Sequence, residues 1–155
     1  MFEKLVNLLE TRNARFRVIE HPPEGKSDLI ARIRGTAPGQ GAKAMLCKSK
    51  DGSGHWVLAV LPGDRRVDFR KVATSVDVKK VTLATPEEAM EVTGCAIGAI
   101  PPFSFSPQVE LVVDPGLVGS FDEIAFNAGR LDRSIVLNSD DYVRIAGPLL
   151  RTLCA

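Results

Sequence analysis

The chain has 155 residues, of which 45% are hydrophobic and 25% are charged, a balance typical of a folded globular protein. No apolar stretch approaches the roughly 18 residues of a membrane-spanning helix, and acidic residues near the start are unlike a signal peptide, so we expect a cytoplasmic protein. A net charge of +1 excludes the broad basic face of strong nonspecific DNA-binding proteins, so any nucleic-acid contact should be small and local.

The first third of the chain begins with a helical pattern and continues with a strand and a second helix. Apolar residues at helical spacing predict a helix over 2–9, and residues 15–20 have the pattern of a strand. Ser27 is expected to cap a helix over 28–34, which Gly35 ends in the left-handed conformation.

The middle of the chain has the pattern of a hairpin followed by a helix and a strand. Two apolar runs, 44–48 and 55–61, flank a polar turn and predict the hairpin. Apolar spacing then predicts a helix over 69–76 with Asp68 as its cap, and residues 78–84 are expected to form a strand.

A capping box marks the start of the next helix. Thr85 is followed by Pro86 and, three residues on, by Glu88, so two backbone amides can be satisfied by side chains. Gly94 is expected to end this helix.

The last third of the chain is predicted to be rich in strands. Strands are expected over 109–113, 123–126 and 134–137, divided by turns at 114–116 and 127–129.

A final helix is expected from Ser139, bent or broken at Gly147-Pro148. Because helices and strands mix without strict βαβ alternation, the expected fold is mixed α/β of an α+β-like kind: one domain, 1–155, with a curled mixed sheet flanked by helices.

Several kinds of chemistry are not expected. Cys47, Cys95 and Cys154 are odd in number and widely spaced, which favours free, buried thiols. His21 and His55 have no ligand-type neighbours at metal-binding spacing, and no nucleophile-elbow motif accompanies them. No metal site and no Ser-His-Asp triad are therefore predicted.

Lys43 follows a glycine-rich stretch, 35–43, that differs from a phosphate-binding P-loop. The spacing is wrong, and Ala44 stands where a hydroxyl residue would bind magnesium, so ATP hydrolysis is not expected. Lys43 itself begins an apolar run and is either a solvated edge residue or a ligand for an anion.

The loop from Gly98 to Pro102 is nearly free of charge and rich in glycine and proline. Gly98 allows close backbone approach, and Pro101 and Pro102 fix φ, so the preceding amides are held in a stable direction. Such amides can bind a carbonyl oxygen or a developing oxyanion, although an ordinary rigid connector has the same composition.

Three segments together resemble a known family. They are GAKAMLCK at 41–48, GCAIGAIPPFSF at 94–105 and FDEIAFNAG at 121–129. They are similar to the YbaK family, related to the editing domain of bacterial prolyl-tRNA synthetases, and nearest its YeaK-like free-standing branch. The resemblance covers nearly the whole chain.

The resemblance implies hydrolysis of the ester that joins a wrong amino acid, serine or threonine, to tRNA. It implies that Lys43 holds the substrate's 3′ end, while Gly98 and Pro102 and the residues between them, Ala99, Ile100 and Pro101, position the aminoacyl group and water. A neighbouring ribose hydroxyl replaces a protein base in such mechanisms, and no cofactor is needed. Mischarged tRNA is the expected partner, with an aminoacyl-tRNA synthetase as a further candidate and neither DNA nor a membrane involved.

Other substrate-binding candidates each have a structural alternative. His21 either lines the pocket or is satisfied by backbone. Phe103 either stacks on the terminal adenine or packs in the core. Asn127 and Gly129 belong to the third family-like segment, yet Asn-Ala-Gly is also a turn former. Cys95, beside the loop, is favoured as a packed thiol over a nucleophile.

Two other functions compete with tRNA editing. A binding module could keep the fold and capture tRNA ends or aminoacyl ligands without turnover. An esterase or amidase could act on free small molecules.

Overall fold

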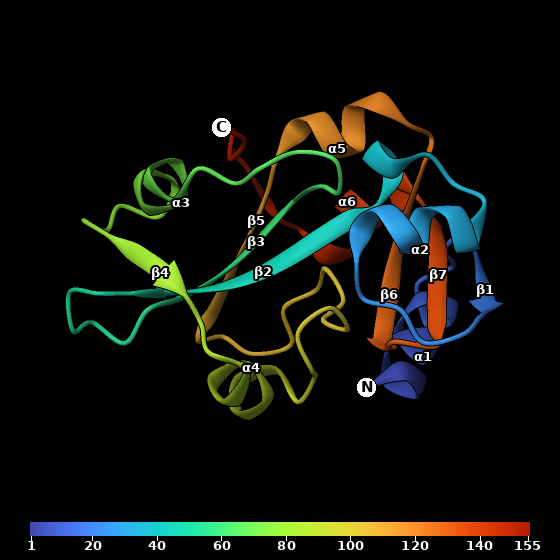
Figure 1. Cartoon of the computed structure of the whole chain (residues 1–155), viewed down its shortest axis with the longest axis horizontal. Helices are drawn as coiled ribbons and strands as arrows, with labels where there is room; N and C mark the ends of the chain where they lie inside the picture. Colours follow the sequence, from blue (N-terminus) through green and yellow to red (C-terminus); the bar gives the residue numbers. More distant parts are fainter.

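The computed structural model describes residues 1–155, in which short helices and strands mix along the chain. The elements in chain order are α1 (Phe2–Thr11), β1 (Phe16–Glu20), α2 (Ser27–Arg34), η1 (Pro38–Gln40), β2 (Ala42–Ser49), β3 (Trp56–Pro62), α3 (Phe69–Ser75), β4 (Val81–Leu83), α4 (Pro86–Thr93), β5 (Val109–Val113), α5 (Pro115–Ser120), β6 (Glu123–Arg130), β7 (Arg133–Asn138), α6 (Ser139–Ala146) and β8 (Leu149–Leu150). The strands form two sheets, which lie at opposite sides of the view in Figure 1.

The smaller sheet has the order β1-β7-β6 and is antiparallel, whereas the larger sheet, β4-β2-β3-β5-β8, is mixed. In the larger sheet β2 and β3 form the predicted hairpin, and β3, β5 and β8 run parallel. The expected mixed sheet and flanking helices are confirmed, with the strands divided between two sheets.

One edge of β2 is only partly covered. β4 pairs with residues 47–49 of β2, so the preceding part of that edge, 42–46, has no strand beside it. Just before it, a parallel bridge between Gly41 and Ala125 connects the start of β2 to β6 of the smaller sheet. The start of β2 therefore lies where the two sheets meet.

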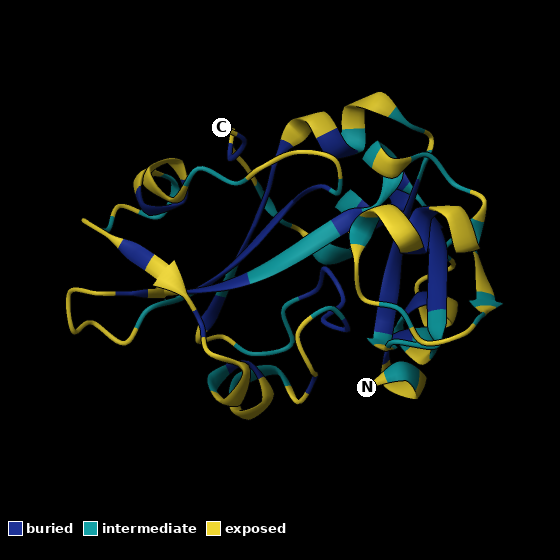
Figure 2. Ribbon diagram, viewed as in Figure 1, coloured by how far each residue is buried: buried dark blue, intermediate teal, exposed yellow.

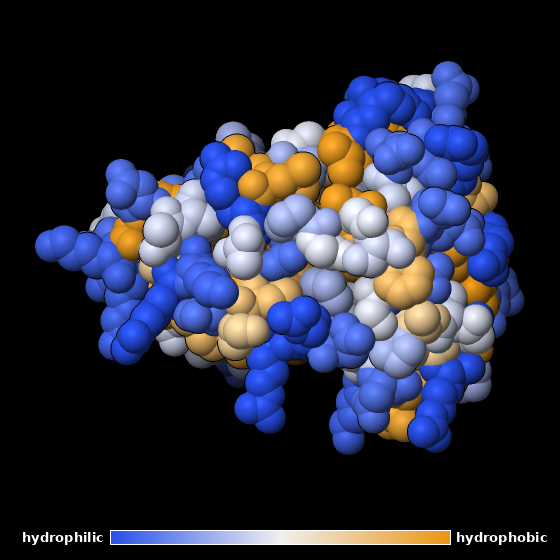
Figure 3. All heavy atoms as spheres, turned by 90° about the horizontal axis from the view of Figure 1, so that it is seen from above, coloured by the Kyte–Doolittle hydropathy of each residue, from blue (hydrophilic) through white to orange (hydrophobic).

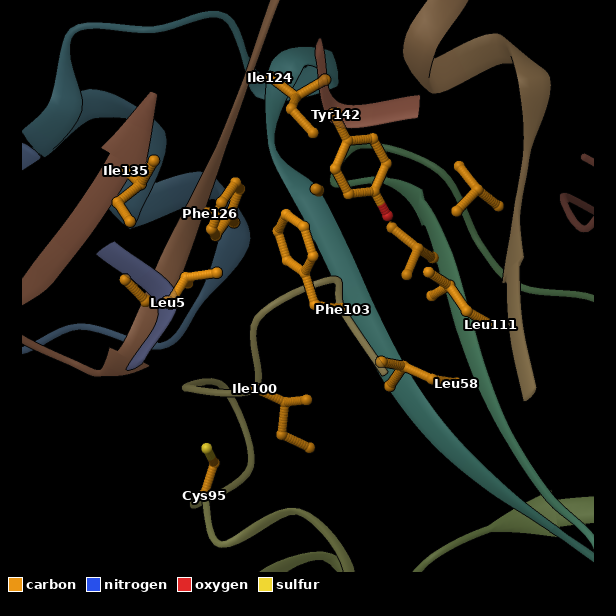
Figure 4. Packing of buried hydrophobic residues seen from close by; sticks show 14 of the residues in the cluster. Leu5, Leu58, Cys95, Ile100, Phe103, Leu111, Ile124, Phe126, Ile135 and Tyr142 are labelled. Carbon is orange, nitrogen blue, oxygen red and sulfur yellow. The ribbon is translucent and has the colours of Figure 1, made fainter. Parts of the chain in front are cut away.

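The main apolar core joins both sheets. It includes Leu58 of β3, Phe126 of β6 and Tyr142 of α6, and the strands that carry it are the dark parts of Figure 2. Phe103 lies between Tyr142 and Phe126 in Figure 4, with ring centroids 5.2 Å and 6.0 Å away respectively. Burying each such side chain contributes about 1.5 to 3 kcal/mol, so this cluster holds the 97–105 loop between the sheets.

Four predicted helix ends are confirmed, and each depends on residues close together in the chain. The Thr85 hydroxyl accepts from the Glu88 amide, and the Glu88 carboxylate accepts from the Thr85 amide, which completes the capping box. Asp68 caps α3, and Gly35 and Gly94 end their helices at φ of 71° and 74°.

The strand expected over 78–84 is shorter, Val81–Leu83, and three other local predictions were wrong. Ser27 is the first residue of α2 and makes no capping bond, because Lys26 occupies the cap position. Asp114 caps the short helix α5 instead of starting a turn: its carboxylate accepts from the Gly116 amide. Residues 127–129 lie inside β6, where a bulge replaces the expected turn, because pairing with β7 continues to Arg130.

The surface is mixed in character. Figure 3 shows hydrophobic patches separated by hydrophilic side chains on the face viewed. None of the helices combines the length and apolar character needed to cross a membrane.

Candidate functional site

Lys43 and Gly98 line the same cavity, which has a volume of about 220 Å³. Its walls come from α2, the partly uncovered edge of β2, the loop that contains Gly98, and Asn127 of β6. Apolar contributions come from Ile30, Ile97 and Ile100. The structure thus brings together the cation and the loop that the sequence singles out, although they lie far apart along the chain.

The ammonium group of Lys43 donates a hydrogen bond to the carbonyl oxygen of Arg65. Burial lowers the pKa of Lys43, while the nearby carboxylate of Asp64 acts to raise it. Side chains alternate along a strand, so Lys43 leaves β2 on the face opposite Ala42. Lys43 therefore borders the cavity but has its charged end directed toward the 64–66 turn.

A second, larger cavity of about 580 Å³ lies beside that turn. Its walls contain Asp64 and Asp114 as well as Arg65 and Lys71, so acidic and basic groups are balanced. The smaller cavity is lined by Arg34 and Lys43 and by no carboxylate. Electrostatics therefore favour an anionic ligand in the smaller cavity.

Gly98 has a backbone conformation that suits glycine. Its φ is +90°, and a Cβ added there would lie 3.2 Å from the Cα of Gly25. A side chain at this position would be strained and would also push against the neighbouring loop. The close approach of Gly98 and Gly25 shapes this end of the cavity.

Other parts of the chain hold the 98–102 loop in place. The bonds are Asn127 Nδ2 to Gly98 O (2.9 Å), Gly129 N to Ala99 O (2.9 Å) and Tyr142 Oη to Pro102 O (2.6 Å). Because the donors belong to β6 and α6, the loop is fixed by the folded core and not by its own sequence alone.

One amide of the loop has no acceptor within the chain. The N–H group of Gly98 makes no intramolecular hydrogen bond, whereas the Ala99 amide donates to Ala96 and residues 97–99 form a turn. Gly98 lines the cavity. A free amide there is suited to bind a carbonyl oxygen.

Sequence reasoning missed Arg34, which lines the cavity at the end of α2. Its Nε donates to the Ser134 hydroxyl at 2.7 Å and its Nη2 to Asn127 Oδ1 at 3.0 Å. Burial lowers its pKa to about 10. The available signal was spacing: Arg34 lies four residues after Ile30 and three after Ala31, on the buried face of the helix.

The predicted site residues are divided between the cavity and its surroundings. Those that line the cavity are Lys43, Gly98, Ile100 and Asn127. Those outside its walls are His21, Ala99, Pro101, Pro102, Phe103 and Gly129. No cluster of three or more His, Cys, Asp or Glu side chains is arranged to hold a metal ion.

The surrounding residues have structural partners. Phe103 is packed in the core, which favours the core alternative over stacking on a base. His21 bonds to Ser134 Oγ at 2.6 Å and to the Pro22 carbonyl at 2.9 Å. Ser134 Oγ also accepts from Arg34, so His21 contacts the cavity residue Arg34 only through this hydroxyl. Cys95 is buried, and burial raises the pKa of its thiol, in keeping with a packed side chain.

Comparison with known proteins gives matches along nearly the whole chain. The family model of the aminoacyl-tRNA editing domain matches residues 21–145. The chain is 50% identical over 149 residues to the multifunctional Ser/Thr-tRNA deacylase ProXp-y of Escherichia coli K12, which covers 96% of this chain and 89% of that protein. It is 31% identical over 119 residues to proline–tRNA ligase of Bacillus pumilus, covering 75% of this chain and 20% of the ligase.

A solved structure has the same architecture. The crystal structure of a candidate trans-editing enzyme for prolyl tRNA synthetase superposes with a TM-score of 0.82 at 25% identity, covering 99% of this chain and 96% of that one. These matches confirm the resemblance noted from the motifs. The chain belongs to the aminoacyl-tRNA editing domain family.

Proposed function

We propose that this protein hydrolyses the ester bond of mischarged tRNA in trans, removing serine and threonine. The observation that carries the proposal is the meeting of Lys43 and the Gly98 loop at one cavity, in a chain half identical to a Ser/Thr-tRNA deacylase. The whole chain, 1–155, acts as one editing domain, because the main core includes Leu5 of α1 as well as Tyr142 of α6.

The reaction needs little from the protein, because an aminoacyl ester is already activated. The free amide of Gly98 binds the carbonyl oxygen of the ester, and one such donor is worth about 3 to 4 kcal/mol in favourable cases. Lys43 turns from the Arg65 carbonyl to hold the 3′ end of the tRNA. The Gly98–Pro102 loop positions the aminoacyl group and the attacking water.

The base that activates water is the neighbouring ribose hydroxyl of the substrate. The titratable side chains at the cavity wall are Arg34 and Lys43, and neither is suited to accept a proton near neutral pH. Water forms a bond to the acyl carbon, the ester C–O bond breaks, and the departing ribose oxygen takes up the proton. A substrate that ends in 2′-deoxyadenosine should therefore be hydrolysed far more slowly.

The cavity favours small amino acids. Its volume of about 220 Å³ is shared with part of the ribose, and Ile30, Ile97 and Ile100 limit the room left for a side chain. Each methylene changes binding by only about 1 to 3 kcal/mol, so selection against larger residues relies on steric exclusion. We place the reaction in the cytoplasm, where charged tRNA is used, with a synthetase as a partner that supplies the mischarged substrate.

Single-turnover deacylation of a panel of mischarged tRNAs tests the proposal. Ser-tRNA and Thr-tRNA should lose their amino acid, and Lys43→Met should slow the reaction by at least about tenfold, the effect of losing one charged hydrogen bond. Lys50→Met is the matched control, because Lys50 is exposed just beyond β2. Binding of all tRNAs without hydrolysis would instead assign a binding module, and equal hydrolysis of free aminoacyl esters would assign a small-molecule esterase.

A further inference from the structure

Arg34 is a partly buried cation without a counter-charge. Its two side-chain hydrogen bonds go to neutral acceptors, the Ser134 hydroxyl and the Asn127 amide oxygen. It takes part in no ion pair, and no carboxylate lines the cavity that it borders. Burying an uncompensated charge is costly, so a group kept in this state has a use for its charge.

The free part of the guanidinium is directed at the cavity wall. Nε and one N–H of Nη2 are occupied, and both N–H groups of Nη1 remain without an acceptor. Nη1 lies 3.9 Å from the point where a Cβ on Gly41 would sit, and Gly41 lines the same cavity. Because Ser134 and Asn127 hold the other nitrogens, the guanidinium is oriented before any ligand arrives.

We propose that Arg34 binds a phosphodiester group of the tRNA acceptor end and so positions the terminal nucleotide over the cavity. The inference rests on the proposed function for the identity of the ligand. A guanidinium binds phosphate oxygens through paired N–H groups, which a lysine ammonium cannot match. Lys43 is engaged with the Arg65 carbonyl, so Arg34 is the cation already fixed at this cavity.

The position of Arg34 also links phosphate binding to the Gly98 loop. Asn127 accepts from Arg34 through Oδ1 and donates from Nδ2 to the carbonyl oxygen of Gly98. One amide group thus sets the distance between the phosphate-binding nitrogen and the loop that holds the ester. The two hydrogen bonds of Asn127, to Arg34 and to Gly98, therefore fix the position of the bound nucleotide relative to the loop.

The test compares two ligands and three proteins. The ligands are the dinucleotide CpA, with its charged phosphodiester, and its uncharged methylphosphonate analogue. The proteins are the full-length wild type, Arg34→Met and the control Arg32→Met, which removes an exposed cation from the same helix. Wild type and Arg32→Met should bind CpA about tenfold or more tightly than the analogue, and Arg34→Met should bind both equally.

Arg34→Lys covers the case in which Arg34→Met does not fold, as judged by circular dichroism. It keeps the charge but loses the paired geometry, and we expect it to retain only part of the preference for CpA. An unchanged preference in a folded Arg34 variant would overturn the proposal. Equal binding of the two ligands by the wild type would overturn it without any variant.

Deacylation kinetics separate this proposal from the function on which it rests. Arg34→Met should raise the protein concentration needed for half-maximal single-turnover rate more than it lowers the maximal rate. A fall in the maximal rate alone would assign Arg34 to the reacting ester and refute phosphate binding. A wild type that deacylates no tRNA but prefers CpA through Arg34 would refute the proposed function and leave this inference standing.

Discussion

Asn127 is tied to Gly98 by a hydrogen bond of 2.9 Å from its side-chain nitrogen to the Gly98 carbonyl oxygen. The same nitrogen donates to the carbonyl of Glu24, and the side-chain oxygen accepts from Arg34 and Ser134. This buried amide has both of its polar atoms satisfied. It therefore connects β6 to the loop that borders the cavity.

Replacing Asn127 by aspartate should loosen the loop. A carboxylate cannot donate, so the carbonyls of Glu24 and Gly98 would face a negative charge in place of an N–H group. We expect a loss of about 1 to 3 kcal/mol in the free energy of unfolding, together with slower deacylation. Urea denaturation and single-turnover assays measure the two effects, and exposed Asn7, changed to aspartate, is the control. The new carboxylate would also pair with Arg34 and offset part of the loss of stability, so deacylation is the deciding measurement. An Asn127→Asp protein of unchanged deacylation rate would contradict the connecting role.

Gly98→Ala should impair activity by moving the loop. The new Cβ would be at φ +90° and 3.2 Å from the Cα of Gly25, so the backbone of one of the two loops has to shift. We expect stability to fall by about 1 to 3 kcal/mol and deacylation to fall more than tenfold. Gly52→Ala separates the causes, because Gly52 has φ +78° but no atom near its Cβ position. Equal deacylation by wild type and Gly98→Ala would refute the importance of this close approach.

Tyr142→Phe tests the bond that holds the far end of the loop. The hydroxyl of this fully buried tyrosine donates to the Pro102 carbonyl at 2.6 Å, and the change removes that oxygen while keeping the ring against Phe103. Leaving the buried carbonyl without a donor should cost about 1 to 3 kcal/mol. Thermal unfolding checks the loss of stability, and hydrogen exchange of the hydrogen-bonded loop amides, those of Ala99 and Phe103, should accelerate relative to that of the β7 amides. Unchanged exchange in the loop would show that the core holds it without this bond.

Asp141 should make stability depend on acidity. Hydrogen bonds from the side chain and the backbone of Arg15 lower the pKa of Asp141 to about 2, below the usual value near 3.9. A depressed carboxyl pKa adds stability above the unfolded-state value, and that contribution is lost as the pH falls from about 4 toward 2. Solvent screens the largely exposed Arg15, so the effect should be about 1 kcal/mol or less.

Urea denaturation at several pH values measures this contribution. In Asp141→Asn, the free energy of unfolding should decrease less between pH 4 and 2 than in the wild type. In the exposed control Asp140→Asn, it should decrease as much as in the wild type. If both variants followed the wild-type curve, the Arg15 bond would contribute nothing to acid sensitivity.

The predicted fold was most accurate where the bonds are local. The capping box of Thr85 and Glu88 spans three residues, so its geometry follows from the sequence alone. The same local logic failed at Asn127, where a turn-forming pattern is overruled by continued pairing of β6 with β7. Propensity is weak compared with a complete set of strand hydrogen bonds.

The sequence by itself determined the helix ends at Gly35, Asp68, Thr85 and Gly94, the β2–β3 hairpin and the motifs that identify the family, because each depends on residues close together in the chain. The tertiary structure decided the rest of the site. It brought Arg34 to Asn127 across 93 residues and Asn127 to Gly98 across 29, and it turned Phe103 into the core. Such contacts depend on how the two sheets pack, and the packing of distant surfaces is not encoded in any short stretch of residues.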